Sequence, residues 1–121
     1  MTSSRLEKNI ERAACAEILR DYGVQCDKYV SPGRRGRQDR IAFIPGGRPL
    51  LMEFKRPGEP LEPLQEHRRA ELVKLGYKVV TVDSVGAAKA AVWDMLVACI
   101  GLHRAKRVAE ERRGKDGQRG I

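Results

Sequence analysis

The stretch RPLLMEFKRPG, residues 48–58, decides the expected fold. Leu50, Met52 and Phe54 should share one face of a strand, because alternate side chains of a strand point the same way. Glu53 and Lys55 then lie side by side on the other face. A charge buried in a sheet costs several kcal/mol unless it is paired or bound to a metal. Glu53 therefore needs a partner, which is either Lys55 alone in an ion pair or a metal ion.

The residues around this strand predict the order α-β-β-β-α-β-α. Hydrophobic spacing and Pro/Gly signals give a helix from Ser3 or Ser4 to about Tyr22, strands at 24–30, at 40–44 and within 48–58, a helix from Pro63 to about Leu75, a strand at 78–82 and a helix capped by Asp83 or Ser84. The turn PGGRP at 45–49 suits antiparallel pairing of the second and third strands. The expected fold is a mixed α/β sheet flanked by helices.

Length and composition favour one domain with a densely charged surface. The chain has 121 residues, of which 41% are hydrophobic and 33% charged, with a formal net charge of +8. One core fits this length, and the positive charge makes nucleic acid the first partner to consider. Residues 103–119 hold seven Lys or Arg against three acids. We expect a domain at 1–101 and a basic tail at 102–121, helical at first and frayed at its end, which either contacts nucleic acid or only aids solubility.

The cysteines and the apolar runs point to a soluble, cytoplasmic protein. Cys15, Cys26 and Cys99 are widely spaced and accompanied by only two histidines, so neither a zinc site nor a disulfide framework can be drawn. We expect reduced thiols packed as small apolar residues. No run approaches the roughly 20 apolar residues that a membrane span needs.

Further acids lie where they could join Glu53. Asp39 comes just before the apolar strand, and antiparallel pairing through the 45–49 turn would bring it to the same end of the sheet. Hard cations such as Mg²⁺ and Mn²⁺ take carboxylate, carbonyl and water oxygens and need neither Cys nor His. Glu7 and Glu11 begin the stripe of the first helix that faces the core. Each either approaches the metal or belongs to an ordinary solvated helix start.

These residues resemble a known family. The resemblance rests on Glu7 followed by Ile10, Gly36 with Asp39 three residues on, Glu53-Phe54-Lys55, and Gln65. In this order they are similar to the motif series of the VRR-NUC (virus-type replication-repair nuclease) domain of the PD-(D/E)XK nuclease superfamily. The resemblance covers about residues 4–97. One departure is Gln38, where the family usually has proline before the aspartate.

The resemblance implies a restriction-endonuclease-like αβββαβ core and a metal-dependent endodeoxyribonuclease. It implies Mg²⁺ or Mn²⁺ held by Asp39, Glu53 and the backbone carbonyl of Phe54, with Glu7 assisting directly or through a water. The ion would polarise the scissile phosphate and lower the pKa of a water. Lys55 would orient or deprotonate that water, and Gln65 would support Lys55 or the substrate. No organic cofactor is expected, since no glycine motif for phosphate binding is present.

Basic residues bracket the acidic centre. Between residues 33 and 56 seven basic residues stand against two acids. The candidates for DNA binding are Arg34, Arg35, Arg37, Arg40, Arg48 and Arg56. Such arginines contact phosphates without reading sequence, so selectivity should come from the shape of the nucleic acid.

The resemblance is to standalone, phage-type VRR-NUC proteins, which act as homodimers on four-way junctions. It implies a Holliday junction resolvase whose two sites cut opposing strands. The interface is expected on the apolar surface of the last core helix, formed by Val92, Trp93, Leu96, Val97 and Ile100. A flap or nicking endonuclease and a non-catalytic nucleic-acid-binding module remain as alternatives.

Overall fold

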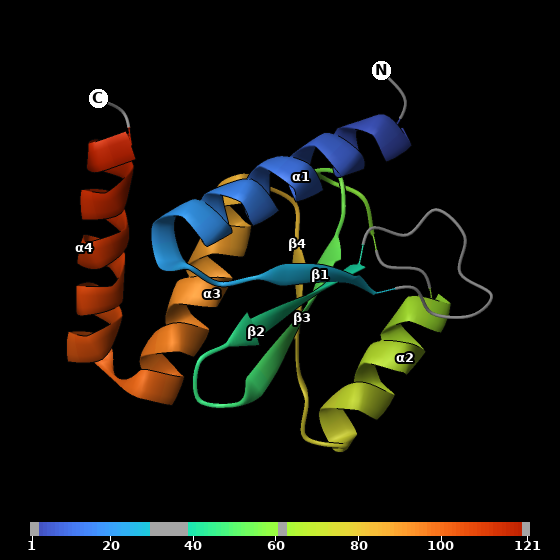
Figure 1. Ribbon diagram of the computed structural model, residues 1–121. Helices are drawn as coiled ribbons and strands as arrows, with labels where there is room; N and C mark the ends of the chain where they lie inside the picture. The colour runs from blue at the N-terminus through green and yellow to red at the C-terminus, as the bar shows by residue number, and fades with distance from the viewer. Residues whose placement is uncertain (1–2, 30–38, 61–62, 120–121) are drawn as a thin grey trace.

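The computed structural model describes residues 3–29, 39–60 and 63–119 (Figure 1). In chain order the elements are α1 (Ser3–Tyr22), β1 (Cys26–Tyr29), β2 (Asp39–Ile44), β3 (Arg48–Phe54), α2 (Pro63–Lys74), β4 (Lys78–Val82), α3 (Val85–Ile100) and α4 (Leu102–Arg119). This is the predicted order with one more helix at its end.

The four strands form one mixed sheet in the order β1-β2-β3-β4. Strands β1, β2 and β3 pair antiparallel, and β3 pairs with β4 in parallel across the α2 crossover. The predicted mixed sheet flanked by helices is therefore confirmed. The strand boundaries differ slightly from the prediction, because β1 is shorter than 24–30 and Asp39 belongs to β2 and not to the loop before it.

The sheet separates two unequal helical layers. Helices α1 and α3 cover one face and α2 covers the other, as Figure 1 shows. The main core lies on the α1/α3 face, where Leu50, Met52 and Phe54 of β3 are buried. This is the apolar face that alternation predicted, and its burial, at about 1.5–3 kcal/mol for each large side chain, holds the sheet against the helices.

Local signals in the sequence account for the ends of several elements. Ser84 is the N-cap of α3, since its Oγ accepts a hydrogen bond of 3.0 Å from the backbone N–H of Ala87. At the β2–β3 turn Gly46 has a φ of +104°, and a Cβ there would lie 3.2 Å from the Cβ of Cys99. Glycine is therefore required both by the backbone conformation and by the close approach of α3.

The C-terminal segment is more ordered than predicted. It forms the regular helix α4, which packs on α1 and α3, and Ala105 is fully buried. The guanidinium of Arg112 donates to the backbone carbonyls of Leu19 (3.0 Å) and Arg20 (3.2 Å) at the end of α1. The first part of the predicted tail is thus joined to the body by packing and hydrogen bonds.

This helix also changes the expected interface. Val92 and Leu96 of α3 are fully buried, and Trp93 packs against Tyr22 with 5.7 Å between ring centroids. The apolar surface of α3 that exceeds what the sheet covers is covered by α1 and α4 of the same chain. Much of the surface on which an interface was predicted is therefore buried within the chain, while Trp93, Val97 and Ile100 stay partly exposed. Among the described helices, none has the length and apolar character needed to cross a membrane.

Candidate functional site

Two carboxylates meet at one end of the sheet. Asp39 of β2 and Glu53 of β3 are directly opposite in the antiparallel register. Such pairs share a face of the sheet, with Cβ atoms about 4.5–5.5 Å apart. Both residues are buried, with 8% and 7% of their surface exposed. The structure therefore brings together the two acids that the sequence analysis placed at one metal site.

Glu53 has an unsatisfied oxygen. Among the described residues its Oε2 atom is buried and has no hydrogen-bond partner. Thr81 of β4 is opposite Glu53 in the parallel register, and within the same described part of the chain its buried Oγ1 also has none. Buried polar atoms without a partner are uncommon, and a bound water or ion is one way in which such atoms are satisfied. Two of them on neighbouring strands mark one polar position on the sheet.

A small crevice opens at this position between the sheet and α2. It is lined by Asp39, Arg40, Leu51, Met52, Glu53, Arg68, Leu72 and Val79, and its volume is about 20 Å³. A space above about 10–15 Å³ accommodates one water. The crevice therefore has room for a single water or ion next to the two acids.

Lys55 lies just beyond the end of β3. Its backbone N–H donates to the carbonyl of Val82 (2.9 Å), which extends the β3–β4 ladder by one residue. The side chain is buried, and its Nζ is 3.6 Å from Oε1 of Glu59. Glu59, which the sequence analysis did not single out, follows Lys55 by four residues and is the carboxylate with which it forms an ion pair.

Glu7 joins this second cluster. Burial and a hydrogen bond with Glu59 raise the pKa of the Glu7 carboxyl, while Lys55 acts in the opposite direction. The pKa of Glu59 is lowered, first by the hydrogen bond with Glu7. The two carboxyls therefore share a hydrogen bond in which Glu7 is the more readily protonated partner. Glu7 of α1 therefore lies beside Lys55 and Glu59.

Glu11, the other candidate from the first helix, has a different environment. It is buried, with 1% of its surface exposed, and accepts a hydrogen bond from Nε of Arg40. Arg40 also donates from Nη1 to the backbone carbonyl of Cys26 (3.1 Å). Glu11 and Arg40 thus form a buried ion pair that joins α1 to β2. The reading of Glu11 as a solvated helix start is corrected, because Arg40 compensates its charge inside the protein.

Helix α2 directs two residues toward the sheet. Gln65 is buried, with 2% of its surface exposed, although by itself it reads as a surface residue at the start of the helix. Arg68 lines the crevice with Asp39 and Glu53. Arg68 was not predicted as a site residue. Its spacing could have indicated this position, because residues 65, 68 and 72 share one face of the helix.

The described arginines differ in their environment. Arg48 and Arg56 are exposed, and Arg56 forms a 3.2 Å ion pair with Glu59. Arg40 is largely turned inward to Glu11. The remaining candidates for DNA binding, Arg34, Arg35 and Arg37, lie outside the described residues.

The acidic pair fits a hard divalent cation. In the described ranges no three His, Cys, Asp or Glu side chains converge into a group able to hold a metal. Mg²⁺ is commonly held by one or two carboxylates, with water and substrate phosphate completing its shell. Asp39 and Glu53 supply two carboxylates, one with an unsatisfied oxygen, beside a space for one ion.

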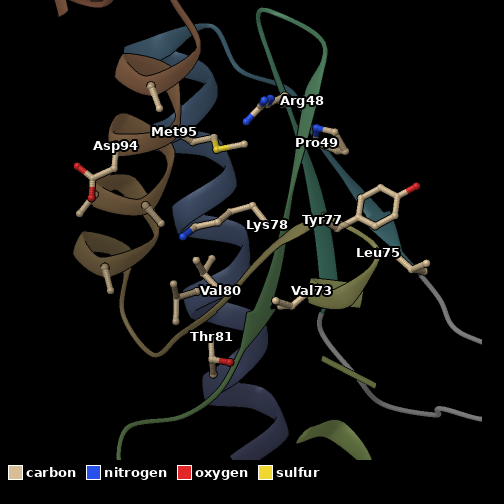
Figure 2. Close-up of a pocket in the computed structure, with 16 residues that line it drawn as sticks. Arg48, Pro49, Val73, Leu75, Tyr77, Lys78, Val80, Thr81, Asp94 and Met95 are labelled. Carbon is tan, nitrogen blue, oxygen red and sulfur yellow. The ribbon is translucent and has the colours of Figure 1, made fainter. Parts of the chain in front are cut away.

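A larger groove lies elsewhere on the described surface. It has a volume of about 990 Å³ and runs along β4, the edge strand of the sheet, between α3 and the end of α2. Figure 2 shows Lys78 and Val80 between β4 and α3, while Leu75 and Tyr77 point outward at its rim. Val73, Leu75 and Tyr77 are exposed, so the rim is an apolar surface.

Comparison with known proteins gives one relative of high similarity. The chain is 40% identical over 78 residues to "Putative nuclease p44" of Acyrthosiphon pisum secondary endosymbiont phage 1. The match covers 64% of this chain and 83% of the phage protein. No protein-family model matches the chain. With this identity over most of the relative's length, the chain belongs to the same protein family as that phage protein.

Proposed function

We propose that this protein is a nuclease that hydrolyses phosphodiester bonds in DNA with the help of Mg²⁺ or Mn²⁺. The observation that carries the proposal is the pair Asp39 and Glu53, opposite each other on adjacent strands, with a buried Glu53 oxygen that lacks a hydrogen-bond partner among the described residues. The name of the phage relative, a nuclease, agrees with it. The finer assignment to the VRR-NUC family rests on the motif series.

The acidic pair would hold the ion. Asp39, Glu53 and the backbone carbonyl of Phe54 are the proposed ligands, with Glu7 as a further acid that acts directly or through a water. When bound, Mg²⁺ or Mn²⁺ supplies Lewis-acid stabilisation of the charge that develops on the phosphate. Because Glu7 lies against Glu59 and Lys55, we propose that it also fixes the position of the lysine.

Lys55 is the proposed catalytic cation. Its ammonium is buried close to Glu59, so that the side chain has a fixed position at the end of the sheet. From there it would orient the attacking water and balance the charge of the phosphate. Gln65, buried at the start of α2, would support the lysine or the substrate. Arg68 of the crevice wall is a candidate contact for the same phosphate.

The proposed substrate is branched DNA, most specifically the four-way Holliday junction, cut by a homodimer. Two-fold symmetry would place two sites on opposing strands of such a junction. The exposed Arg48 and Arg56 would contact phosphates, together with the arginines before β2. The exposed apolar rim of the groove between β4 and α3 is the described surface that best suits contact with a second copy.

The test is cleavage of a labelled four-way junction, a flap and a plain duplex with Mg²⁺ or Mn²⁺. We expect metal-dependent cutting of the junction by the wild type, loss of cutting in Asp39→Asn, and retained junction binding by that variant. Glu111→Gln, which changes an exposed acid on α4, away from the acidic pair and from the groove, is the matched control and should cut normally.

The alternatives predict other results. Equal cutting of junction and duplex would contradict the resolvase, and preference for the flap would favour a flap endonuclease. Binding without cutting at any metal concentration would identify a non-catalytic module. Sedimentation that finds only monomer, with and without a junction, would contradict paired cutting by a homodimer.

A further inference from the structure

Two of the three cysteines are neighbours in space. Cys15 lies on α1 and Cys26 begins β1, and their thiols are hydrogen-bonded to each other. Both side chains are partly exposed, and none of the three cysteines is in a disulfide. Cys99 lies apart, on α3 against Gly46 of the β2–β3 turn. The fold therefore creates a thiol pair that the spacing of the cysteines in the sequence did not predict.

The surroundings make the two thiols unequal. The hydrogen bond with Cys26 lowers the pKa of the Cys15 thiol, and Arg40 acts in the same direction, against burial and the charge of Glu11. The hydrogen bond with Cys15 raises the pKa of Cys26, and burial adds to this. Arg40 donates to the Cys26 carbonyl and to Glu11, which lies one helical turn before Cys15, so its positive charge is close to the pair and favours the reactive thiolate.

We propose that Cys15 and Cys26 are an oxidation site that forms an intramolecular disulfide when the protein meets a peroxide or a small-molecule disulfide. With hydrogen peroxide, the Cys15 sulfur takes one oxygen to become a sulfenic acid and one water is released. Cys26 then attacks that sulfur, the S–O bond breaks, and the second water leaves. Two thiols and one peroxide thus give one disulfide and two waters.

The position of the pair defines the consequence. The bond would tie α1 to β1 beside the Glu11–Arg40 ion pair, whose arginine also donates to the carbonyl of Cys26. A covalent link at this point restricts the unfolded chain and holds α1 on the sheet. Oxidation should therefore stabilise the fold reversibly. This inference is independent of the nuclease proposal, because it concerns thiols outside the acidic cluster.

The experiment is a thiol count on the full chain. Reduced protein at low concentration is treated with hydrogen peroxide or oxidised glutathione, denatured, and titrated with a thiol reagent. We expect the three thiols to fall to one. Intact mass should drop by two hydrogens, peptide mapping should link Cys15 to Cys26, and the melting temperature should rise and return to its first value after reduction.

Serine variants separate the pair from the third thiol. Cys99→Ser should behave as the wild type, with its remaining thiols lost together and the same rise in melting temperature. Cys15→Ser and Cys26→Ser should each form no internal disulfide and show no such rise. Retention of all three thiols, a link to Cys99, or links only between separate molecules would each overturn the proposal.

Discussion

Both faces of the central sheet bury charge, but they compensate it in different ways. On the α1/α3 face Glu11 is paired with Arg40, and the guanidinium reaches a backbone carbonyl as well. On the α2 face Asp39 lies opposite Glu53, and one Glu53 oxygen has no hydrogen-bond partner among the described residues. The first arrangement is complete within the chain and stabilises the fold. The second leaves one buried carboxylate oxygen without a partner among the described residues, which is where we propose that the metal ion binds.

Strand β3 contributes to both faces. Phe54 is buried in the core, while the residue before it, Glu53, faces the crevice. Alternation along one strand thus separates a stabilising face from a face arranged for binding. Substitutions on the two faces should therefore have opposite effects on stability and on activity.

The largest effect is expected from Glu53→Gln. Loss of the carboxylate should slow metal-dependent DNA cleavage by about a thousandfold, which corresponds to about 4 kcal/mol of transition-state stabilisation. In the absence of metal the variant should melt at a higher temperature, since a buried charge with an unsatisfied oxygen is removed. Cleavage assays and thermal unfolding measure both effects. A variant that cuts normally, or that melts at a lower temperature, would contradict this account of the α2 face.

The second effect concerns the ion pair on the opposite face. Arg40→Met should lower the free energy of unfolding by about 3–5 kcal/mol, because Glu11 stays buried without its partner. Glu11→Leu should cost less, since Arg40 is more exposed and can reach water. The double variant should recover most of the loss in urea unfolding. If the double variant loses as much stability as the two single variants together, the pair is not coupled.

The third effect concerns the apolar side of β3. Leu50→Ala should lower the free energy of unfolding by about 2–4 kcal/mol, because it leaves a cavity under α1 and α3. Junction cleavage at a temperature where the variant is folded should change little. Urea unfolding and a cleavage assay at low temperature test the two statements. A strong fall in the cleavage rate at a temperature where the variant is folded would show that the two faces are not separate.

The smallest effect is expected where α1 meets α3 at the surface. Asp21 accepts hydrogen bonds from Arg20 (2.7 Å) and Lys89 (2.7 Å), which lower its pKa from 3.8 to about 2. A lowered pKa contributes stability above the unfolded value, and this contribution is lost as the pH falls from about 4 to 2. Asp21→Asn should therefore cost less than about 1 kcal/mol at pH 7 and only a small part of that near pH 2. Urea unfolding at both pH values measures the difference, and an equal loss at both would contradict the pKa shift.

The order of the elements and the main acidic pair could be predicted, because both follow from local rules. The turn at 45–49 fixes the register of β2 and β3, and this register alone places Asp39 opposite Glu53. The apolar side of β3 followed from alternation. The catalytic role of these residues, the metal and the branched substrate remain predictions.

The rest depended on contacts between distant residues. Helical spacing puts Glu7 and Glu11 on one face, but it cannot tell that Arg40 pairs with Glu11 while Lys55 and Glu59 surround Glu7. The packing of α4 was missed because its inner face is short and made mostly of small side chains: Ala105 is buried, and Val108, Ala109 and Arg112 are half-buried. The contact between Cys15 and Cys26 likewise arises only when α1 lies on the sheet.

The contact of Arg112 with the end of α1 has a practical consequence for anyone who redesigns the protein. A variant shortened after Gly101 would lose the guanidinium that binds the Leu19 and Arg20 carbonyls and the buried Ala105. We expect such a variant to be poorly soluble because these contacts are lost, and not because a charged tail is missing. Purification tags and fusion partners are therefore better joined after α4 than in place of it.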